Sequence, residues 1–312
     1  MKPEILMVSP LLPRVMETLE EDFIVHRLWE TPDRTALLTK VADRVRGLAT
    51  TGGQGASAEL IDTLPKLEII ACYGVGVDAI DRARARARGI VVTNTPDVLN
   101  EDVADLAIAL LLAAARRLCE ADRFVRSGRW LKEELGLGHR VSGKRLGILG
   151  LGRIGQAIAK RAAAFDMTIG YHQRRQPPDL PYRYYDDLVA MARDCDFLVA
   201  IVPGGEGTRH LIDRTVLEAL GPNGTLINVA RGSVVDEKAL VEALAEGRLG
   251  GAGLDVFANE PQVPEALFAM DNVVLLPHIG SATVETRTAM GQLVIDNLRA
   301  HFAGQPLLTP VP

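Results

Sequence analysis

The sequence predicts an α/β protein built on parallel β-sheets. Short aliphatic and β-branched runs alternate with helical patterns along the chain, as expected for strands joined by crossover helices. One such run, at residues 145–149, meets a tight glycine turn and then strong helix formers. The chain has 312 residues, of which 47% are hydrophobic and 24% charged, so it is long enough for two domains with sizeable cores.

The first third of the chain contains five predicted strands. A helix is expected at Ala58–Leu64, and a long helix is expected from about Asp102 to Val125, with Asn100 as its candidate N-cap. Because the long helix precedes the glycine turn, we expect it to bridge two domains. The predicted strands are Ile5–Val8, Phe23–Leu28, Val45–Thr50, Leu67–Cys72 and Ile90–Thr93.

The glycine turn has the pattern Gly150-x-Gly152-x-x-Gly155 between a strand and a helix. Gly150 permits the tight turn, Gly152 lets the backbone approach a pyrophosphate, and Gly155 lets the helix pack closely on the strand. The start of the helix then offers unpaired N–H groups and a positive dipole end to phosphates. The pattern in this context predicts a dinucleotide-binding unit.

The βα alternation continues to the C-terminus. A final helix at Val284–Phe302 is long enough to return to the first domain. The predicted strands are Met167–Tyr171, Phe197–Val202, Thr225–Val229, Gly253–Val256 and Val273–Leu276, and the helices between them are Asp186–Arg193, Thr215–Leu220 and Glu237–Glu246.

The end of the second strand of this unit indicates which dinucleotide binds. NAD-binding units place an acid about 20 residues beyond the glycines, to accept hydrogen bonds from the ribose. Here Gln173, Arg174 and Arg175 occupy that place, and no acid occurs before Asp179. A guanidinium pairs bidentately with a phosphate. We therefore predict NADPH over NADH; the alternative is two solvated loop arginines.

Composition argues against several classes of partner. The net charge of −5 and the pI near 5.8 disfavour a nucleic acid or an anionic membrane. The basic run at residues 82–88 is interpreted as a solvated helix face rather than a binding patch. The longest apolar helix, near Leu106–Ala115, is too short to span a bilayer, and the N-terminus has no apolar signal run.

Three widely spaced cysteines, Cys72, Cys119 and Cys195, stand among apolar or helical residues. An odd number without metal-ligand spacing indicates reduced thiols rather than a disulfide framework or a metal site. We therefore expect a cytoplasmic protein without a bound metal.

Polar residues follow three of the predicted strands. Arg231, Glu260 and His278 come just after the strands at 225–229, 253–256 and 273–276. Each has a structural alternative: a salt bridge for the arginine, a helix-start carboxylate for the glutamate, and a satisfied buried histidine. Because parallel strands end at one edge of a sheet, all three are expected beside the dinucleotide.

These blocks resemble the D-isomer-specific 2-hydroxyacid dehydrogenases over essentially the whole chain, and most of all the NADPH-dependent glyoxylate/hydroxypyruvate and hydroxyphenylpyruvate reductases. The resemblance implies that Arg231, Glu260 and His278 are catalytic. The similar segments are Gly74-Val-Gly-Val-Asp78, Val92-Thr-Asn-Thr-Pro96, Gly150-Leu-Gly-Arg-Ile-Gly155, Asn228-Val-Ala-Arg-Gly232, Gly253-Leu-Asp-Val-Phe257 and Pro277-His-Ile-Gly280.

The resemblance also implies an architecture. Two Rossmann-like or flavodoxin-like parallel-sheet domains enclose an active-site cleft. Residues 1–99 and 285–312 form the substrate-binding domain, and residues 100–284 form the dinucleotide-binding domain. A homodimer is implied as well, and its arm is expected near residues 128–143, a polar, glycine-containing excursion between a long helix and a strand.

The expected reaction is reduction of a 2-oxo acid to a D-2-hydroxy acid, with hydride from the nicotinamide. His278 is the candidate proton donor and Glu260 the carboxylate that stabilises its charged ring. The Arg231 guanidinium can hold the substrate carboxylate and polarise the carbonyl. Backbone N–H groups of Val75 and Gly76 are expected to form a second carboxylate cradle; the alternative is a plain turn after a strand.

Further cofactor contacts are expected around the nicotinamide. Asp255 is expected to orient the carboxamide or ribose side of the cofactor. The segment 203–208 is richer in glycine than is common in the family. The full set of expected cofactor contacts is Gly150, Leu151, Gly152, Arg153, Ile154, Gly155, Gln173, Arg174, Arg175, Val202, Pro203, Thr208, Val229, Ala230, Arg231, Asp255, Gly280 and Ser281.

Several alternatives remain at this point. A hydroxyphenylpyruvate-type reductase would need a larger apolar pocket than glyoxylate or hydroxypyruvate. An NADH-linked D-lactate-type dehydrogenase is disfavoured by Arg174 and Arg175, and an NAD(P)H-sensing corepressor by the short tails. A purely structural module would not explain three convergent polar residues. The candidate pocket residues are Met7, Leu11, Leu12, Tyr73, Val75 and Trp130 of the partner subunit, at a spacing that plain core residues also have.

Overall fold

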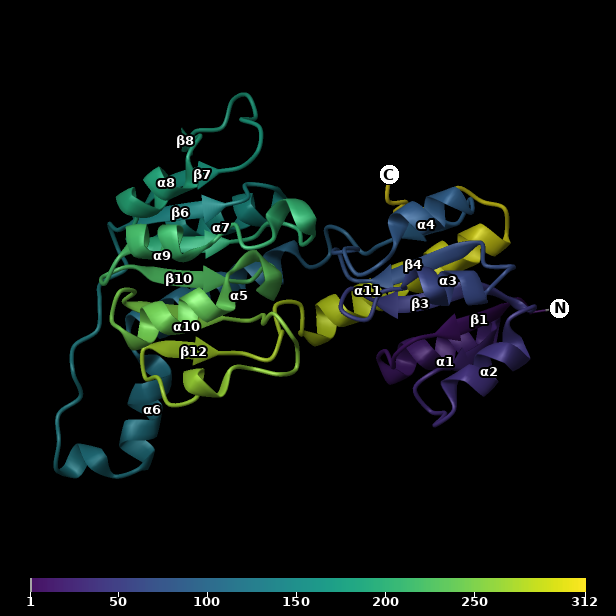
Figure 1. Cartoon of the computed structure of the whole chain (residues 1–312), viewed down its shortest axis with the longest axis horizontal. Helices are drawn as coiled ribbons and strands as arrows, with labels where there is room; N and C mark the ends of the chain where they lie inside the picture. Colours follow the sequence, from purple (N-terminus) through teal and green to yellow (C-terminus); the bar gives the residue numbers. More distant parts are fainter. Residues whose placement is uncertain (1) are drawn as a thin grey trace. The chain divides into compact units, whose positions relative to one another are not determined.

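The structure is a computed structural model that describes residues 2–312 and divides into two compact units (Figure 1). The first unit contains the segment that ends at Leu99 together with Ser281–Pro312, and the second is Asn100–Gly280. The sequence placed these boundaries at 99/100 and 284/285. Both units have parallel sheets with helices, so the predicted α/β class with two parallel-sheet domains is confirmed.

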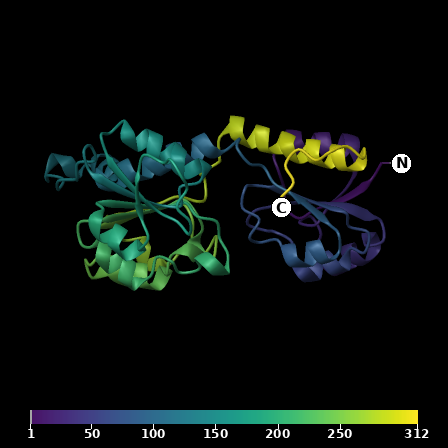
Figure 2. The same cartoon turned by 90° about the horizontal axis from the view of Figure 1, so that it is seen from above.

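The first unit is built on a five-stranded parallel sheet in the order β2-β1-β3-β4-β5. Helices α1 and α11 cover one face, and α3 and α4 cover the other (Figure 2). The strands are β1 (Glu4–Met7), β2 (Ile24–Arg27), β3 (Val45–Thr51), β4 (Ile69–Tyr73) and β5 (Val91–Thr93). The helices are α1 (Pro13–Asp22), α2 (Arg34–Val41), α3 (Ala58–Thr63), α4 (Arg82–Ala87) and α11 (Val284–Phe302).

The second unit is built on a seven-stranded parallel sheet in the order β12-β11-β10-β9-β6-β7-β8. The strand order reverses between β6 and β9, the kind of switch point at which open α/β sheets bind ligands. The strands are β6 (Arg145–Leu149), β7 (Thr168–His172), β8 (Arg183–Tyr185), β9 (Phe197–Ala200), β10 (Thr225–Asn228), β11 (Gly251–Leu254) and β12 (Val273–Leu275). The helices are α5 (Asn100–Ala115), α6 (Leu118–Arg126), α7 (Arg153–Ala163), α8 (Leu188–Asp194), α9 (Arg214–Leu220) and α10 (Glu237–Ala245).

The prediction of one long helix over residues 102–125 is wrong, because this segment forms two helices, α5 and α6. The chain breaks between α5 and α6 at Arg117, whose φ of 55° lies in the left-handed region. Its guanidinium pairs bidentately with the nearly buried Glu120, at 2.5 and 2.7 Å. Helix α5 also includes Asn100 as its first residue rather than as a preceding cap.

The segment after α6 leaves the body of the second unit. A short 3₁₀ turn, η1 (Arg129–Leu131), follows α6, and residues 132–142 then return to β6 (Figure 1). Large apolar side chains are exposed along this segment and α6: Leu118 (51%), Val125 (54%), Trp130 (71%), Leu131 (89%) and Leu137 (95%). Between the end of α5, residues 137–142 and Phe165 lies a cavity of about 470 Å³.

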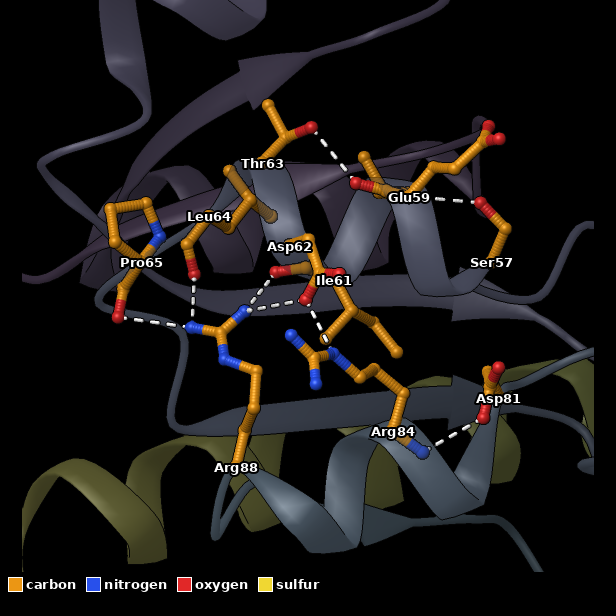
Figure 3. Close-up of polar contacts among 11 residues, drawn as sticks. Ser57, Glu59, Ile61, Asp62, Thr63, Leu64, Pro65, Asp81, Arg84 and Arg88 are labelled. Atoms are coloured by element: carbon orange, nitrogen blue, oxygen red, sulfur yellow. Dashed lines mark hydrogen bonds and ion pairs between the residues drawn. The ribbon is translucent and has the colours of Figure 1, made fainter.

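The basic run at 82–88 forms α4 and has a structural role (Figure 3). Arg84 donates to the carboxylate of Asp62 at 2.6 Å. Arg88 donates to carbonyl oxygens at the C-terminal end of α3, those of Ile61, Leu64 and Pro65. The face is largely exposed, as predicted, but Arg88 caps the end of α3, and both arginines join α3 to α4.

Three further properties of residues 2–312 bear on function. No helix in this range is both apolar enough and long enough to cross a membrane. No group of three or more His, Cys, Asp or Glu residues in the same range could hold a metal ion. All three cysteines are free; Cys72 and Cys195 are buried and Cys119 is exposed.

Candidate active site

The glycine turn after β6 has the geometry of a pyrophosphate cradle. Gly150 has a φ of 98°, and a side chain there would also collide with Ile201 and Val202. A methyl group at Gly155 would lie 2.2 Å from the carbonyl oxygen of Gly150, so the helix packs on the strand as closely as backbone permits. Nothing lies within 4 Å of such a group at Gly152, so this point is open to a ligand. Helix α7 starts there with its N–H groups directed to the turn.

The end of β7 is tied to this turn. The Gln173 side chain accepts from the Leu151 amide at 3.0 Å and donates to the Arg175 carbonyl at 2.8 Å. Arg174 and Arg175 are exposed, and no ion pair within residues 2–312 involves either guanidinium. The two cations therefore stand next to the pyrophosphate cradle with their donors available for an anion.

His278 and Glu260 form a hydrogen-bonded pair. The Nδ1 atom of His278 lies 2.8 Å from Oε2 of Glu260, and the amide of Phe257 donates to Oε1 at 3.1 Å. The histidine side chain is 40% exposed and the glutamate 34%. Because Glu260 engages Nδ1, the ring presents Nε2 as its remaining polar atom, the arrangement of an imidazole oriented for proton transfer.

Asp255 holds the turn that presents His278. Both of its carboxylate oxygens accept backbone bonds, from Ile279 at 2.7 Å and Gly280 at 2.8 Å. The His278 amide donates to the Asp255 carbonyl at 2.9 Å, and His278 has a φ of 53°. A left-handed histidine is uncommon and persists only where its surroundings impose it. The nearly buried Asp255 imposes it, a role that sequence reasoning did not assign to it.

The two carboxyl groups are shifted in opposite directions. Burial favours the neutral form and raises the pKa of Asp255, although the amides of Ile279 and Gly280 oppose this shift. Burial acts in the same sense on Glu260, but the hydrogen bond and charge of His278, the Phe257 amide and the charge of Arg231 together outweigh it and lower the pKa of Glu260. Glu260 therefore stays ionised beside the histidine at neutral pH.

Arg231 is positioned by backbone packing between neighbouring strand ends. The buried Asn228 donates to the Arg231 carbonyl at 3.0 Å and accepts from the Ala230 amide at 3.1 Å. A methyl group at Gly232 would lie 1.9 Å from the backbone of Phe257, so the loops after β10 and β11 touch. The positive charge of Arg231 also contributes to the lowered pKa of Glu260. Arg231, Glu260 and His278 thus follow β10, β11 and β12 at one edge of the sheet.

The remaining predicted cofactor residues lie in the loops at this edge. The Thr208 hydroxyl donates to the Pro203 carbonyl at 2.7 Å and closes the glycine-rich loop. Val202 lies against Gly150, so this loop and the cradle are neighbours. Val229 and Ala230 are buried after β10, Arg153 and Ile154 begin α7, and Gly280 and Ser281 follow the His278 turn.

The loop with Val75 and Gly76 belongs to the first unit and follows β4 directly. Three contacts fix its backbone. The Asn94 side chain donates to the Val75 carbonyl at 2.9 Å, the Thr95 amide donates to the Gly74 carbonyl at 2.9 Å, and the Cys72 thiol lies 3.6 Å from the Gly76 carbonyl. Within residues 2–312, no hydrogen bond has the amide of Val75 or of Gly76 as its donor.

The C-terminal tail supports Asn94. The Thr309 hydroxyl donates to the Asn94 carbonyl at 2.6 Å and accepts from the side chain of Asn297 at 2.9 Å. Asn297 lies on α11 and is fully buried. Its side-chain oxygen accepts hydrogen bonds from the amides of Leu308 and Thr309, both at 3.1 Å. A polar network therefore runs from α11 through the tail to the Val75 loop. Sequence reasoning missed Asn94, Asn297 and Thr309, since nothing local marks them as partners.

Comparison with known proteins adds a direct finding. Residues 108–280 match the model described as D-isomer specific 2-hydroxyacid dehydrogenase, NAD binding domain. The chain is 53% identical over 307 residues to a glyoxylate/hydroxypyruvate reductase A of Arabidopsis thaliana, covering 98% of both proteins. It is 52% identical over 307 residues to a hydroxyphenylpyruvate reductase of Plectranthus scutellarioides, again covering 98% of both.

A solved structure is similar over the same length. It is an NADPH-dependent glyoxylate/hydroxypyruvate reductase of Sinorhizobium meliloti, in complex with NADP and malonate. The TM-score is 0.94 and the sequence identity 50%, with 100% of this chain and 97% of that chain covered.

Proposed function

The chain belongs to the D-isomer specific 2-hydroxyacid dehydrogenases, and from that premise we propose that it reduces glyoxylate or hydroxypyruvate to the D-2-hydroxy acid with NADPH. The family resemblance inferred from the sequence is thereby confirmed, and the chain is an oxidoreductase of that family. The observation that supports the proposed reaction most directly is the hydrogen bond between His278 and Glu260 at 2.8 Å.

His278 is proposed as the general acid. Reduction turns the carbonyl oxygen into an alkoxide, which needs a proton. With Nδ1 engaged by Glu260, the ring can deliver that proton from Nε2. The ionised Glu260 stabilises the imidazolium before transfer and fixes the orientation of the ring.

Arg231 and the Val75 loop are proposed to bind the substrate carboxylate. The guanidinium fork suits a carboxylate and also polarises the adjacent carbonyl. The amides of Val75 and Gly76 supply further donors, and the contacts from Asn94 and Cys72 hold their peptide units in place. Together these donors favour an anionic 2-oxo acid over a neutral ketone.

The cofactor preference is proposed from Arg174 and Arg175. Both are exposed at the end of β7, and their charge suits the 2′-phosphate of NADPH. The open Gly152 turn and the start of α7 fit a pyrophosphate. Asp255, the 203–208 loop and the residues after β10 are proposed to border the nicotinamide. NADPH, when bound, supplies the hydride for the carbonyl carbon.

One alternative substrate is favoured by a specific finding. The chain is nearly as similar to the hydroxyphenylpyruvate reductase as to the glyoxylate/hydroxypyruvate reductase, at 52% and 53% identity. We therefore keep 4-hydroxyphenylpyruvate as the second candidate.

The assembly is proposed to be a homodimer in the cytoplasm. Trp130, Leu131 and Leu137 are more than two-thirds exposed on a segment that leaves the body of the second unit. Such an apolar surface on a projecting arm is typical of an interface. Sedimentation should give a dimer at micromolar concentration; a monomer would contradict the proposal.

The test is NADPH oxidation at 340 nm by the purified protein with glyoxylate, hydroxypyruvate and 4-hydroxyphenylpyruvate, repeated with NADH. We expect turnover with the first two substrates, and faster turnover with NADPH than with NADH. Tight NADPH binding without turnover of any substrate would contradict the proposed function and would favour a sensor of NADPH.

A further inference from the structure

A cavity of about 260 Å³ lies in the first unit, at the carboxyl edge of its sheet. Its walls come from the segment after β1, from the last residue of β4 and from the first turns of α11. The lining residues are Pro10, Leu11, Leu12, Pro13, Tyr73 and Arg287. A water molecule takes up about 30 Å³ of liquid, so the cavity has room for several non-hydrogen atoms of a ligand.

The walls combine an apolar surface with one cation. Leu11, Leu12 and the two prolines supply the apolar part, and the nearly buried ring of Tyr73 adds to it. Arg287 is the only lining side chain with a charge. No ion pair within residues 2–312 involves it, so its charge is not neutralised by a carboxylate.

Tyr73 holds Arg287 in place. Its hydroxyl donates to the Arg287 carbonyl at 2.8 Å, and the guanidinium carbon lies 5.5 Å from the centre of the ring. A cation over an aromatic face is favourable and fixes the guanidinium plane. The edge of the guanidinium keeps donors for an oxygen acceptor, since an arginine has five N–H groups.

The cavity lies beside the loop proposed to bind the substrate carboxylate. Tyr73 ends β4, and Val75 is two residues further on. Two residues span at most about 7 Å, so the Val75 amide and the Tyr73 wall are within the length of a small 2-oxo acid. A substrate carboxylate at this loop leaves the rest of the molecule within reach of the cavity.

We propose that this cavity is a subsite for the substrate chain beyond the oxo carbon. Besides glyoxylate and hydroxypyruvate, the site then admits 2-oxo acids of about four to six carbons, and among these it favours acids whose outer carbons bear hydroxyl or carboxylate oxygens. The methylene or carbinol carbons lie against Leu11 and Leu12, and an outer oxygen accepts from Arg287. This inference rests on the proposed function, because it needs the carboxylate of the same molecule at Val75 and Gly76.

The test compares kcat/KM for four 2-oxo acids in wild type and Arg287→Met, which keeps an unbranched, flexible side chain but removes the charge and the donors. The substrates are glyoxylate, 2-oxohexanoate, 2-oxoglutarate and 2-oxogluconate. Wild type should prefer 2-oxoglutarate and 2-oxogluconate, which carry outer oxygens, over 2-oxohexanoate, which carries none. In Arg287→Met we expect this preference in kcat/KM to fall about tenfold or more, the effect of losing one charge-assisted hydrogen bond. A larger loss for 2-oxoglutarate identifies a carboxylate as the preferred group, and a larger loss for 2-oxogluconate identifies hydroxyls.

Two matched variants separate the pocket from a general loss of structure. Arg287→Lys retains the charge and should keep part of the selectivity. Leu11→Trp fills the cavity and should lower kcat/KM for all three longer substrates relative to glyoxylate. The inference is overturned if Arg287→Met leaves the preference for oxygen-bearing substrates over 2-oxohexanoate unchanged and Leu11→Trp leaves the preference between the longer substrates and glyoxylate unchanged.

Failure of the inference is distinguishable from failure of the proposed function. If wild type reduces glyoxylate but neither variant alters the ratios, the subsite is refuted and the proposed function stands. If wild type reduces neither glyoxylate nor hydroxypyruvate with either cofactor, the proposed function is refuted, and the subsite with it.

Discussion

The His278 turn and the Val75 loop are both short segments after parallel strands, yet they are supported in opposite ways. The partners of the His278 turn are close to it in the sequence. Glu260 lies 18 residues before His278, and Asp255 lies a few residues further away. The Val75 loop is held through Asn94 by Thr309, which is 215 residues from Asn94. The first region contains carboxyl groups with shifted pKa values, and the second is fixed by hydrogen bonds to the backbone carbonyls of Gly74 and Val75.

This difference indicates a division of tasks. A charged pair that is ordered by its own turn can tune proton transfer. In the Val75 loop the carbonyl oxygens of Gly74 and Val75 already accept hydrogen bonds, and the proposed task of the amides of Val75 and Gly76 is to bind an anion. We therefore expect changes in the first region to alter kcat and changes in the second to alter KM.

The largest effect is expected for His278→Ala. Without its general acid the enzyme should lose about 10²–10⁴-fold in kcat for glyoxylate. NADPH binding, followed by its fluorescence, should stay within about twofold of wild type. Residual activity near that of wild type would remove His278 from the role of proton donor.

The double variant Arg174→Ala/Arg175→Ala should change cofactor choice. Losing charge-assisted hydrogen bonds to a phosphate costs about 1.5–3 kcal/mol, or roughly 10–100-fold in kcat/KM for NADPH. The value for NADH should change little, because its ribose hydroxyl has no charge. Equal losses with both cofactors would contradict the assignment. Arg193→Ala, at an exposed arginine on α8 of the same unit, provides the control.

Glu260→Gln should reduce kcat about tenfold at neutral pH and move the basic limb of the activity profile to lower pH. The amide retains the shape of the side chain but not the charge that favours the imidazolium. Glu246→Gln, at an exposed glutamate that pairs with Arg248, is the matched control. If kcat falls at every pH and the basic limb stays at the same pH, Glu260 has only a packing role and does not stabilise the imidazolium.

The same variant tests stability against pH. The pKa of Glu260 is lower in the folded protein, so its ionised form stabilises the fold above the unfolded value of about 4.3. That contribution is lost as pH falls through the folded pKa. Urea unfolding should therefore show a difference between wild type and Glu260→Gln at pH 7 that narrows below about pH 4.

The smallest effect is expected for Thr309→Val. It removes the hydroxyl that joins Asn297 to Asn94, and one such hydrogen bond is worth about 1 kcal/mol, or roughly fivefold. We expect KM for glyoxylate to rise by about that factor while kcat is retained. Thr309→Ser, which keeps the hydroxyl, should behave like wild type; if it does not, the methyl group rather than the hydrogen bond matters.

The parts of the molecule that could be predicted from the sequence are those whose signals lie close together in the chain. The strand-turn-helix at Gly150 is contiguous in the chain, and the approximate positions of the strands before Arg231, Glu260 and His278 follow from hydrophobic patterns. Helix α1 was missed because Leu12 provides no side-chain cap, which leaves Pro13 as its main local signal. The break at Arg117 was missed because its cause, the pairing with Glu120 in a left-handed turn, is not marked by glycine or proline.

The support of the Val75 loop could not be predicted in the same way. Asn94, Asn297 and Thr309 are common polar residues, and only the folded chain brings them together. The opposite pKa shifts of Asp255 and Glu260 could not be predicted either. Burial and the neighbouring groups decide the direction of each shift, and both depend on the fold.

The most direct test of the division measures kcat and KM for glyoxylate in Glu260→Gln and Thr309→Val side by side, at saturating NADPH and neutral pH. We predict that the first variant loses kcat with little change in KM, and that the second raises KM with kcat retained. If both variants change the same parameter, the His278 turn and the Val75 loop do not divide chemistry from recognition.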